Sequence, residues 1–283
     1  MIKSVQHKLT ALFLSIILFL FFIPSVSAAD SHQTAGVTVI EISKEDMERE
    51  QGGAISKALL TAKENATEAN ICKIVVPAGT YYLYDRLEIY SNTWLSMNGV
   101  KLVRSPQARN MLRVGKMDSF TDGVTGYHYR NITIEGGVFD AAWLEGTVLK
   151  IGHAKNVMMK NVSFCNSHNY HFVETAAVDG LTVTGCSFSD QLADEGFTQA
   201  YEALQLDIVK DGNFYDYRSE DLCCKNVLIE DCTFRNCPRG VGSHTSVFNN
   251  PHRNITIRNN TFLNMGSVAI QTLGWANAHI TAT

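Results

Sequence analysis

The chain lacks a strongly basic charge and a metal-binding cysteine pattern. After its first 29 residues it also lacks any apolar run long enough to cross a membrane. Its 283 residues carry a formal net charge of −4, which argues against nucleic acid as a partner because phosphate binding needs a basic surface. Its seven cysteines include no CxxC pair and no zinc-ligand spacing. The sequence therefore predicts no metal or other cofactor, except Ca²⁺ under one alternative given below.

The first 29 residues have the features of a secretory signal peptide. Lys3 and Lys8 supply the positive start, residues 12–23 form a near-continuous apolar core, and residues 25–28 are mostly small. We expect cleavage after residue 28 or 29, which predicts a secreted or cell-surface protein with no membrane attachment after cleavage. The alternative is an uncleaved membrane anchor, which the short apolar run disfavours.

A nine-residue phrase recurs five times from residue 131 onward. Each copy opens with Asn or Gly, continues with alternating apolar residues and ends in Phe. The copies are Asn131–Phe139, Asn156–Phe164, Gly180–Phe188, Asn226–Phe234 and Asn254–Phe262. Their first residues are 25, 24, 46 and 28 positions apart. A period near 25 without an intervening helix pattern predicts a solenoid of short strands, whose opening Asn or Gly makes a turn with left-handed backbone.

The expected organisation is one all-β domain, a right-handed parallel β-helix over residues 30–283. Residues 30–130 would hold the N-terminal cap and first coils, and residues 131–283 the regular coils. Apolar side chains at helical spacing in residues 54–63 predict a capping helix that covers the open end. Residues 277–283 begin another repeat, which leaves open a C-terminally truncated chain or an end covered by a partner; the oligomeric state is not determined.

The 46-residue step has two interpretations, a single coil with inserted loops or a degenerate extra coil. It contains one strand-like stretch, residues 202–209, followed by the polar aromatic stretch 211–218. This content favours a single coil, and long loops on a rigid scaffold commonly carry function.

The cysteines also have two interpretations. Cys186 and Cys232 occupy the same position of two repeats, which favours stacking as small buried hydrophobes. Cys223 or Cys224 with Cys237 is a candidate disulfide in an oxidising compartment.

A second set of strand-like stretches stacks between the repeat phrases. These are residues 171–175, 203–207, 240–244 and 269–272. Alternate residues of a strand face opposite sides, so inward leucines in 203–207 place Gln205 and Asp207 outward. The same alternation places Glu174 and His244 outward in coils about 4.8 Å apart. We therefore expect these four side chains in one patch of sugar-ring size.

This patch suits hydrolysis of a glycosidic bond, which needs one carboxyl as acid and another as base or nucleophile. We predict Asp207 as the general acid, Glu174 or Glu202 as its partner carboxylate, and His244 in support. Substrate binding is assigned to polar and aromatic residues on or near the patch: Gln205, Gln271, Arg239, Arg218, Tyr215 and Tyr217. The arginines would hold a uronate carboxylate, and the tyrosines would stack on a sugar ring.

Residues 54–59 (Ala-Ile-Ser-Lys-Ala-Leu), 75–81 (Val-Val-Pro-Ala-Gly-Thr-Tyr) and 95–102 resemble the entry to the pectin-lyase-like right-handed parallel β-helix. The resemblance covers roughly residues 50–280. It is nearest to polygalacturonase-like glycoside hydrolases of family 28 and to bacterial right-handed β-helix repeat proteins. It implies a secreted protein that acts on a plant or microbial polysaccharide.

The polygalacturonase motifs are matched only in part. Asp207 falls on the strand that supplies an acid in that family, and His244, in Gly-Ser-His-Thr, falls where its histidine motif follows. The family's Asp-Asp pair and Arg-Ile-Lys motif are missing. The resemblance therefore implies the fold more closely than the activity.

Two other functions stay open. A polysaccharide lyase or epimerase would use Arg239 or His244 as a base, with Ca²⁺ held by Asp190, Asp194 and Glu195. A non-catalytic carbohydrate-binding surface adhesin would need only the polar face, and the missing acid pair fits that function. The main expectation is a glycoside hydrolase whose partner is a polysaccharide.

Overall fold

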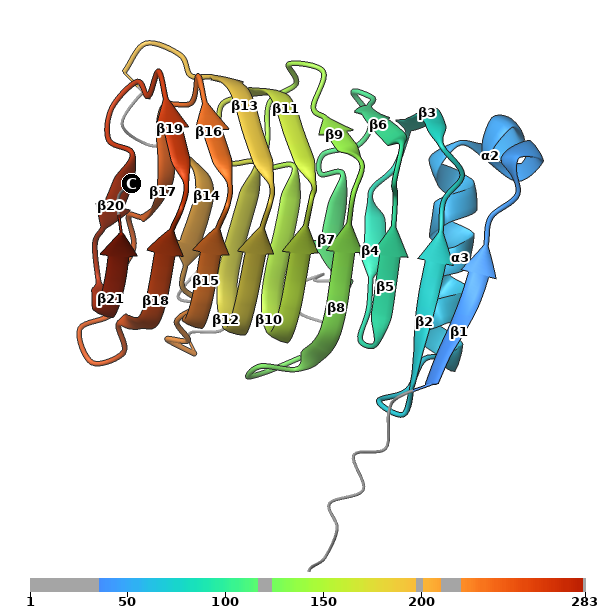
Figure 1. The fold of residues 1–283 in the computed structure, drawn as a ribbon, viewed down its shortest axis with the longest axis horizontal. Coiled ribbons are helices and arrows are strands. Elements are labelled where there is room, and N and C mark those ends of the chain that lie inside the picture. The colour runs from blue at the N-terminus through green and yellow to red at the C-terminus, as the bar shows by residue number, and fades with distance from the viewer. Residues whose placement is uncertain (1–35, 117–123, 197–200, 210–219, 282–283) are drawn as a thin grey trace, which may run out of the picture. The chain divides into compact units, whose positions relative to one another are not determined.

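The computed structural model describes residues 36–116, 124–196, 201–209 and 220–281. These residues belong to one compact unit, Ala35–Thr283, in which strands follow one another side by side (Figure 1). The predicted signal peptide and the predicted substrate-binding residues Tyr215, Tyr217 and Arg218 lie outside the described residues. In the described part of the chain, no helix is both long enough and apolar enough to span a membrane.

The chain folds into a right-handed parallel β-helix with three faces, here called A, B and C. Face A holds β1 Gly36–Glu41, β2 Asn70–Val75, β5 Thr93–Ser96, β8 Tyr129–Glu135, β15 Lys225–Glu230, β18 His252–Arg258 and β21 Trp275–Thr281. Face B holds β3 Gly79–Leu83, β6 Val100–Arg104, β9 Val138–Asp140, β11 Ser163–His168, β13 Ser187–Leu192, β16 Thr233–Arg235 and β19 Thr261–Leu263.

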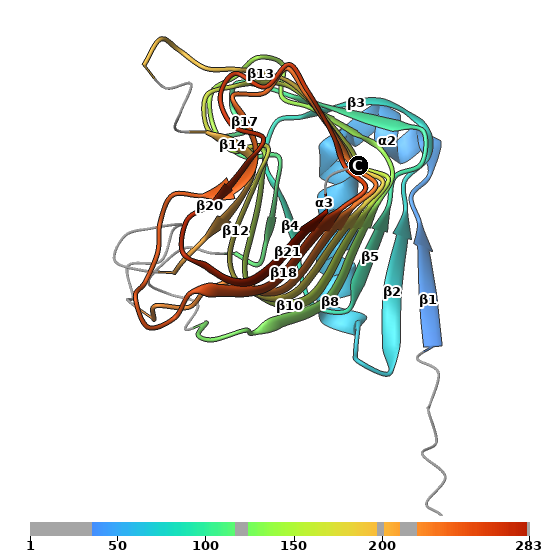
Figure 2. The ribbon, with the colours of Figure 1, turned by 60° about the vertical axis from the view of Figure 1, so that its left-hand side comes forward.

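Face C carries the strands that the sequence placed between the repeat phrases. It holds β4 Leu87–Ile89, β7 Leu112–Val114, β14 Glu202–Asp207, β17 Arg239–Ser243 and β20 Ile270–Thr272. Two longer strands, β10 Leu149–Lys160 and β12 Val173–Thr184, begin on face C and end on face A. Faces A and C are therefore joined within single strands at the middle of the solenoid (Figure 2).

The residues that open the repeats have the left-handed backbone that the sequence predicted. The φ angles are 56° at Asn131, 55° at Asn156, 82° at Gly180, 56° at Asn226 and 55° at Asn254. Asn tolerates this region better than other residues with a side chain. The side-chain amides also bond between coils, because Asn156 Nδ2 donates to Asn131 Oδ1 at 2.7 Å and Asn254 Nδ2 donates to Asn226 Oδ1 at 2.9 Å.

The phenylalanines that close the repeats stack along the interior. Successive ring centroids are 5.4, 5.1, 4.7 and 4.9 Å apart in the series Phe139, Phe164, Phe188, Phe234 and Phe262. Phe188 is aligned with Phe234 in neighbouring strands, although 46 residues separate them in sequence. The long step is therefore one coil with an insertion, as predicted.

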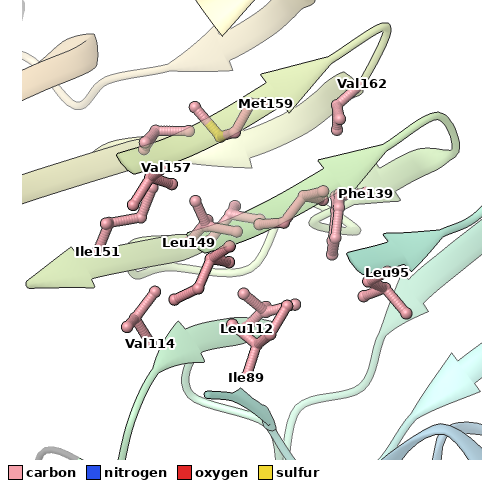
Figure 3. Close-up of a cluster of buried hydrophobic side chains, with 14 of the residues drawn as sticks. Ile89, Leu95, Leu112, Val114, Phe139, Leu149, Ile151, Val157, Met159 and Val162 are labelled. Atoms are coloured by element: carbon pink, nitrogen blue, oxygen red, sulfur yellow. The ribbon is translucent and has the colours of Figure 1, made fainter. Parts of the chain in front are cut away.

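Aliphatic side chains from the three faces fill the space beside this stack. Figure 3 shows Ile89, Leu112 and Leu149 from face C and Leu95 and Val157 from face A as members of one buried cluster, and all five are at most 2% exposed. Burial of such side chains contributes about 1.5–3 kcal/mol each. The packed interior leaves the chemistry to side chains that point outward.

Two helices cover the N-terminal end of the solenoid. The helix predicted for residues 54–63 is α3 Gly52–Asn65, which buries Ile55 and Leu59 and contacts β2, β3, β4 and β5. A short helix, α2 Lys44–Glu50, precedes it, and the side chain of Ser43 caps its first turn. The prediction of an N-terminal capping helix is confirmed.

Buried cysteines serve as packing residues. Cys186 and Cys232 are 2% and 1% exposed, and they precede the paired strands β13 and β16 as the stacking interpretation predicted. All seven cysteines are free thiols. The candidate disulfide between Cys223 or Cys224 and Cys237 is therefore wrong. The first two precede face A and the third precedes face C, so they belong to different corners of the coil.

Candidate functional site

Face C aligns the strands as the sequence predicted. β12, β14, β17 and β20 pair in parallel, with Val173, Leu204, Val241 and Ile270 in register. The next position along each strand aligns Glu174, Gln205, Gly242 and Gln271. There is no room for a side chain at Gly242, because a Cβ there would lie 2.9 Å from Gln271 Cβ and 3.1 Å from Glu202 Cγ.

A pocket of about 490 Å³ opens on this face, here called the central pocket. It is lined by Lys150, Tyr170, His171, Glu174, Tyr201, Gln205, Asp207 and His244. The four residues expected to share one patch, Glu174, Gln205, Asp207 and His244, are therefore brought together.

These four side chains lie deeper than the sequence indicated. Glu174, Gln205 and Asp207 are 7%, 1% and 5% exposed, whereas the expectation was an open, solvated face. The alternation gave their direction correctly. Their burial arises because side chains of adjacent coils stand about 4.8 Å apart and shield one another; only His244 keeps a well-exposed side chain, at 42%.

Asp207 is a buried carboxyl with few hydrogen bonds to offset its burial. Its Oδ1 accepts a hydrogen bond from the backbone N–H of Ile208 at 2.8 Å. Burial raises the pKa of Asp207 to about 6; the nearby charge of Glu174 also raises it, whereas hydrogen bonds with Ile208 and Thr245 lower it. Asp207 therefore retains its proton to a higher pH than an exposed aspartate and can act as a proton donor.

Glu174 is the carboxylate that shares this pocket. Its Oε2 lies 2.8 Å from Lys150 Nζ and accepts a hydrogen bond from Thr147 Oγ1 at 3.1 Å. The register partner of Glu174 in the next coil is Gln205, and Asp207 lies two residues after Gln205 on the same strand. Strand geometry then places the two Cα atoms about 8 Å apart.

Glu202 lies beneath the pocket and is fully buried. One carboxylate oxygen lies 3.2 Å from Arg239 Nη1, and the other accepts from His244 Nδ1 at 3.2 Å. Burial opposes ionisation of Glu202, but the hydrogen bond from His244 and the charges of His171 and His244 lower its pKa below the ordinary value. The same hydrogen bond to Glu202 raises the pKa of His244.

Strand alternation alone would have placed Glu202 on the core side with Leu204. Ala203 and Leu204 instead both pack in the core, so the alternation breaks between them and Glu202 turns toward His244.

Arg239 is only 9% exposed and faces Glu202, which differs from the open, substrate-facing position that the sequence indicated. Gln271 is partly buried and donates to the Ser243 carbonyl at 3.1 Å.

Four lining residues were not singled out from the sequence: Lys150, Tyr170, His171 and Tyr201. Lys150 was detectable, because it lies one repeat period before Glu174 and is aligned with it. The Tyr170 and Tyr201 rings are 5.4 Å apart, and the His171 and His244 rings are 5.9 Å apart. Burial lowers the pKa of His171, which favours the neutral imidazole.

The residues predicted to hold Ca²⁺ under the lyase alternative have other partners. Asp190 accepts from Asn236 Nδ2 at 2.7 Å, and Asp194 lies 2.8 Å from His168 Nε2. Glu195 is exposed. Within the described ranges, no cluster of three or more His, Cys, Asp or Glu side chains is arranged to hold a metal ion.

Known proteins share this architecture. Plasmin and fibronectin-binding protein A of Streptococcus pneumoniae is 24% identical over 265 residues, which cover 80% of this chain and 36% of that protein. The chain thus spans about a third of this relative's length. The crystal structure of PfbA, a surface adhesin of the same species, matches with a TM-score of 0.70 and 21% identity over 87% of this chain and 61% of that one.

A putative glycosyl hydrolase from Parabacteroides merdae matches with a TM-score of 0.51 and 14% identity, over 82% of this chain and 97% of that one. At these identities the structural likeness concerns the fold. The sequence pattern of the family described as "Right handed beta helix region" matches residues 114–283, which is more than half of the chain. The chain belongs to this right-handed β-helix family.

Proposed function

We propose that this protein hydrolyses glycosidic bonds in a polysaccharide that binds along face C. The observation that carries the proposal is the pairing of two unlike carboxyls in the central pocket. Burial raises the pKa of Asp207 to about 6, while Glu174 forms an ion pair with Lys150. Two carboxyls in unlike surroundings, one buried and one beside a lysine, are what acid and base catalysis at a glycosidic bond requires.

In this mechanism Asp207 donates its proton to the leaving oxygen, and Glu174 accepts a proton from the attacking water. In inverting glycosidases the two carboxyl groups are about 6.5–9.5 Å apart, which leaves room for that water. A carboxylate that acts as base on water, and does not bond to the sugar, predicts inversion at the anomeric carbon.

Glu202 has a positioning role in this proposal because its full burial keeps it from touching substrate. Its carboxylate accepts from His244 Nδ1, so Glu202 orients the imidazole and favours its charged form. His244 Nε2 lies 3.1 Å from Gln205 Nε2, so the oriented imidazole also contacts the amide that lines the pocket.

Two tyrosines favour a sugar as the occupant of the pocket. Tyr170 is 47% exposed and its ring lies beside that of Tyr201 at the pocket wall. Such rings combine apolar faces with a polar hydroxyl, which suits the mixed surface of a pyranose. The predicted signal peptide and the match to a surface adhesin support a location outside the cell or at its surface.

The test is a reducing-end assay on a polysaccharide panel, with absorbance at about 235 nm recorded with and without EDTA; that wavelength detects unsaturated uronates. We expect new reducing ends without absorbance. Asp207→Asn should lose at least about 100-fold in turnover, since a general acid contributes about 10²–10⁴-fold. The matched control is Asp231→Asn, an exposed turn residue with φ 54°, which Asn also tolerates.

Unchanged turnover in Asp207→Asn would remove Asp207 from the mechanism. Absorbance that disappears with EDTA would indicate β-elimination in place of hydrolysis.

A non-catalytic surface adhesin is the second candidate. It is favoured by the alignment with plasmin and fibronectin-binding protein A over 80% of this chain and by the TM-score of 0.70 to a surface adhesin. This candidate predicts saturable binding to immobilised plasmin or fibronectin, together with silence of the folded protein in the reducing-end assay. Binding that competes with an active polysaccharide substrate would instead place both activities on face C.

A further inference from the structure

A second pocket of about 560 Å³ adjoins the central pocket on the side nearer the N-terminal cap. The two pockets share Lys150 and Tyr170 as a common wall. The second pocket is also lined by Arg104, Arg109 and Glu145. It is here called the cationic pocket, because its two arginines outnumber its one acidic residue, Glu145, while Lys150 forms an ion pair with Glu174.

The basic groups of the central pocket are balanced by carboxylates. Lys150 lies 2.8 Å from Glu174, and both Arg239 and His244 lie 3.2 Å from Glu202. Asp207 adds a further carboxyl beside them. Each of these basic groups already has a carboxylate beside it, so an acidic sugar gains less from charge pairing here than beside a cation that has no carboxylate partner. The central pocket therefore favours a neutral sugar.

The cationic pocket has the opposite balance. Arg104 is 5% exposed, and its guanidinium donates to the carbonyl oxygens of Ala108 at 2.6 Å and Glu145 at 2.7 Å. These partners are carbonyl groups, and among the residues that the structure describes no carboxylate forms an ion pair with Arg104. Arg109 is exposed at the same pocket, and the Glu145 carboxylate accepts from Asn169 Nδ2 at 2.8 Å. An anionic group is favoured here.

The two pockets lie along the axis of the solenoid. Glu174 belongs to the coil of β12, and Arg109 precedes β7, which is two coils away through β10. This spacing is about 10 Å, a span of a few sugar units. One extended chain can therefore occupy both pockets.

We propose that the ligand is a heteropolysaccharide in which a neutral sugar occupies the central pocket and an acidic sugar, bearing a carboxylate or a sulfate ester, occupies the cationic pocket. The inference rests on the proposed function only in taking a polysaccharide as the ligand. It excludes a homopolymer of uronates and a wholly neutral glycan as preferred ligands.

Binding can be measured by isothermal titration calorimetry on the Asp207→Asn protein, which holds the ligand uncut. Four oligosaccharides of equal length serve as probes. Hyaluronan alternates a carboxylate sugar with a neutral one, keratan sulfate carries sulfate esters on a neutral backbone, oligogalacturonate is uniformly acidic, and mannan is neutral. We expect one of the first two to bind at least about tenfold tighter than the last two, and the better of the two identifies the anionic group.

Arg109→Ala should weaken the preferred probe about fivefold and leave mannan binding unchanged, and Arg109→Lys should keep most of the affinity. Lys155→Ala is the control, because it removes an exposed positive charge at the face A end of β10. Raising the salt concentration should weaken the preferred probe more than mannan.

Equal or tighter binding of oligogalacturonate or mannan would overturn the inference, as would unchanged affinity in Arg109→Ala. The outcome is separate from that of the hydrolase proposal. If an alternating glycan binds as expected but the wild-type protein cuts no glycan, the proposed ligand class stands and the hydrolase proposal is rejected. Cleavage of oligogalacturonate by the wild-type protein would retain hydrolysis and reject the ligand class.

Discussion

Replacing Asp207 by Asn should stabilise the protein at neutral pH, although the same change should abolish hydrolysis. Asp207 is 5% exposed, and its pKa is raised by burial from 3.8 to about 6. Between about pH 4 and pH 6 the unfolded chain loses this proton while the folded chain retains it. The folded state then binds more protons, so its stability falls as the pH rises through this window.

The size of the effect follows from the shift in pKa. A shift of about two units corresponds to about 3 kcal/mol, at 1.36 kcal/mol per unit. Asn resembles the neutral acid in shape and does not ionise. The free energy of unfolding of Asp207→Asn should therefore equal that of the wild type near pH 4 and exceed it by up to about 3 kcal/mol at pH 8.

Urea denaturation of both proteins at pH 4, 5, 6, 7 and 8 measures this difference directly. Asp231→Asn, which removes an exposed carboxyl, should change stability by less than about 0.5 kcal/mol at each pH. A difference between Asp207→Asn and wild type that stays constant with pH would refute the assignment of a raised pKa to Asp207. A variant that becomes less stable than the wild type as the pH rises would mean that the pKa of Asp207 is lowered.

Three further predictions concern the same structure. Glu202→Gln should lower the free energy of unfolding, measured in urea, by about 3–5 kcal/mol, because the buried charge of Arg239 then has no partner. Adding Arg239→Met should recover part of this loss. A loss below about 1 kcal/mol would contradict a buried ion pair between Glu202 and Arg239. The kcat/KM for hydrolysis should fall as the pH rises through about 6, where Asp207 loses its proton; a flat profile between pH 5 and 8 would argue against this acid. Phe188→Ala should cost about 3–5 kcal/mol in the same denaturation assay, since Phe188 stacks between two buried rings, and a cost near that of a surface change would mean that the coils do not stack there.

The repeat phrase was sufficient to predict the fold because each coil uses the same local rules. Asn131 and its counterparts open turns with left-handed backbone, and Phe139 and its counterparts stack, so a period in sequence becomes a spacing in space. Even the 46-residue step was readable, because the phrase returns in full at Asn226 after the insertion. These features depend on neighbours in sequence or on copies one period apart.

The grouping of the four candidate residues was predictable for the same reason. Alternation within residues 203–207 and the stacking of neighbouring coils placed Glu174, Gln205, Asp207 and His244 on one face, and the structure brings them into one pocket. The period also relates Lys150 to Glu174, although that pair was not recognised from the sequence.

The electrostatic character of the site was decided by tertiary structure alone. The break in alternation between Ala203 and Leu204 turns Glu202 toward Arg239 and His244, and no sequence period signals such a break. Burial raises the pKa of Asp207, and its depth depends on side chains from several coils together. The sequence by itself determined which residues share a face, because strand alternation and coil period are local and repetitive. Their burial and charge pairing arise from contacts between coils, which only the folded chain brings within reach.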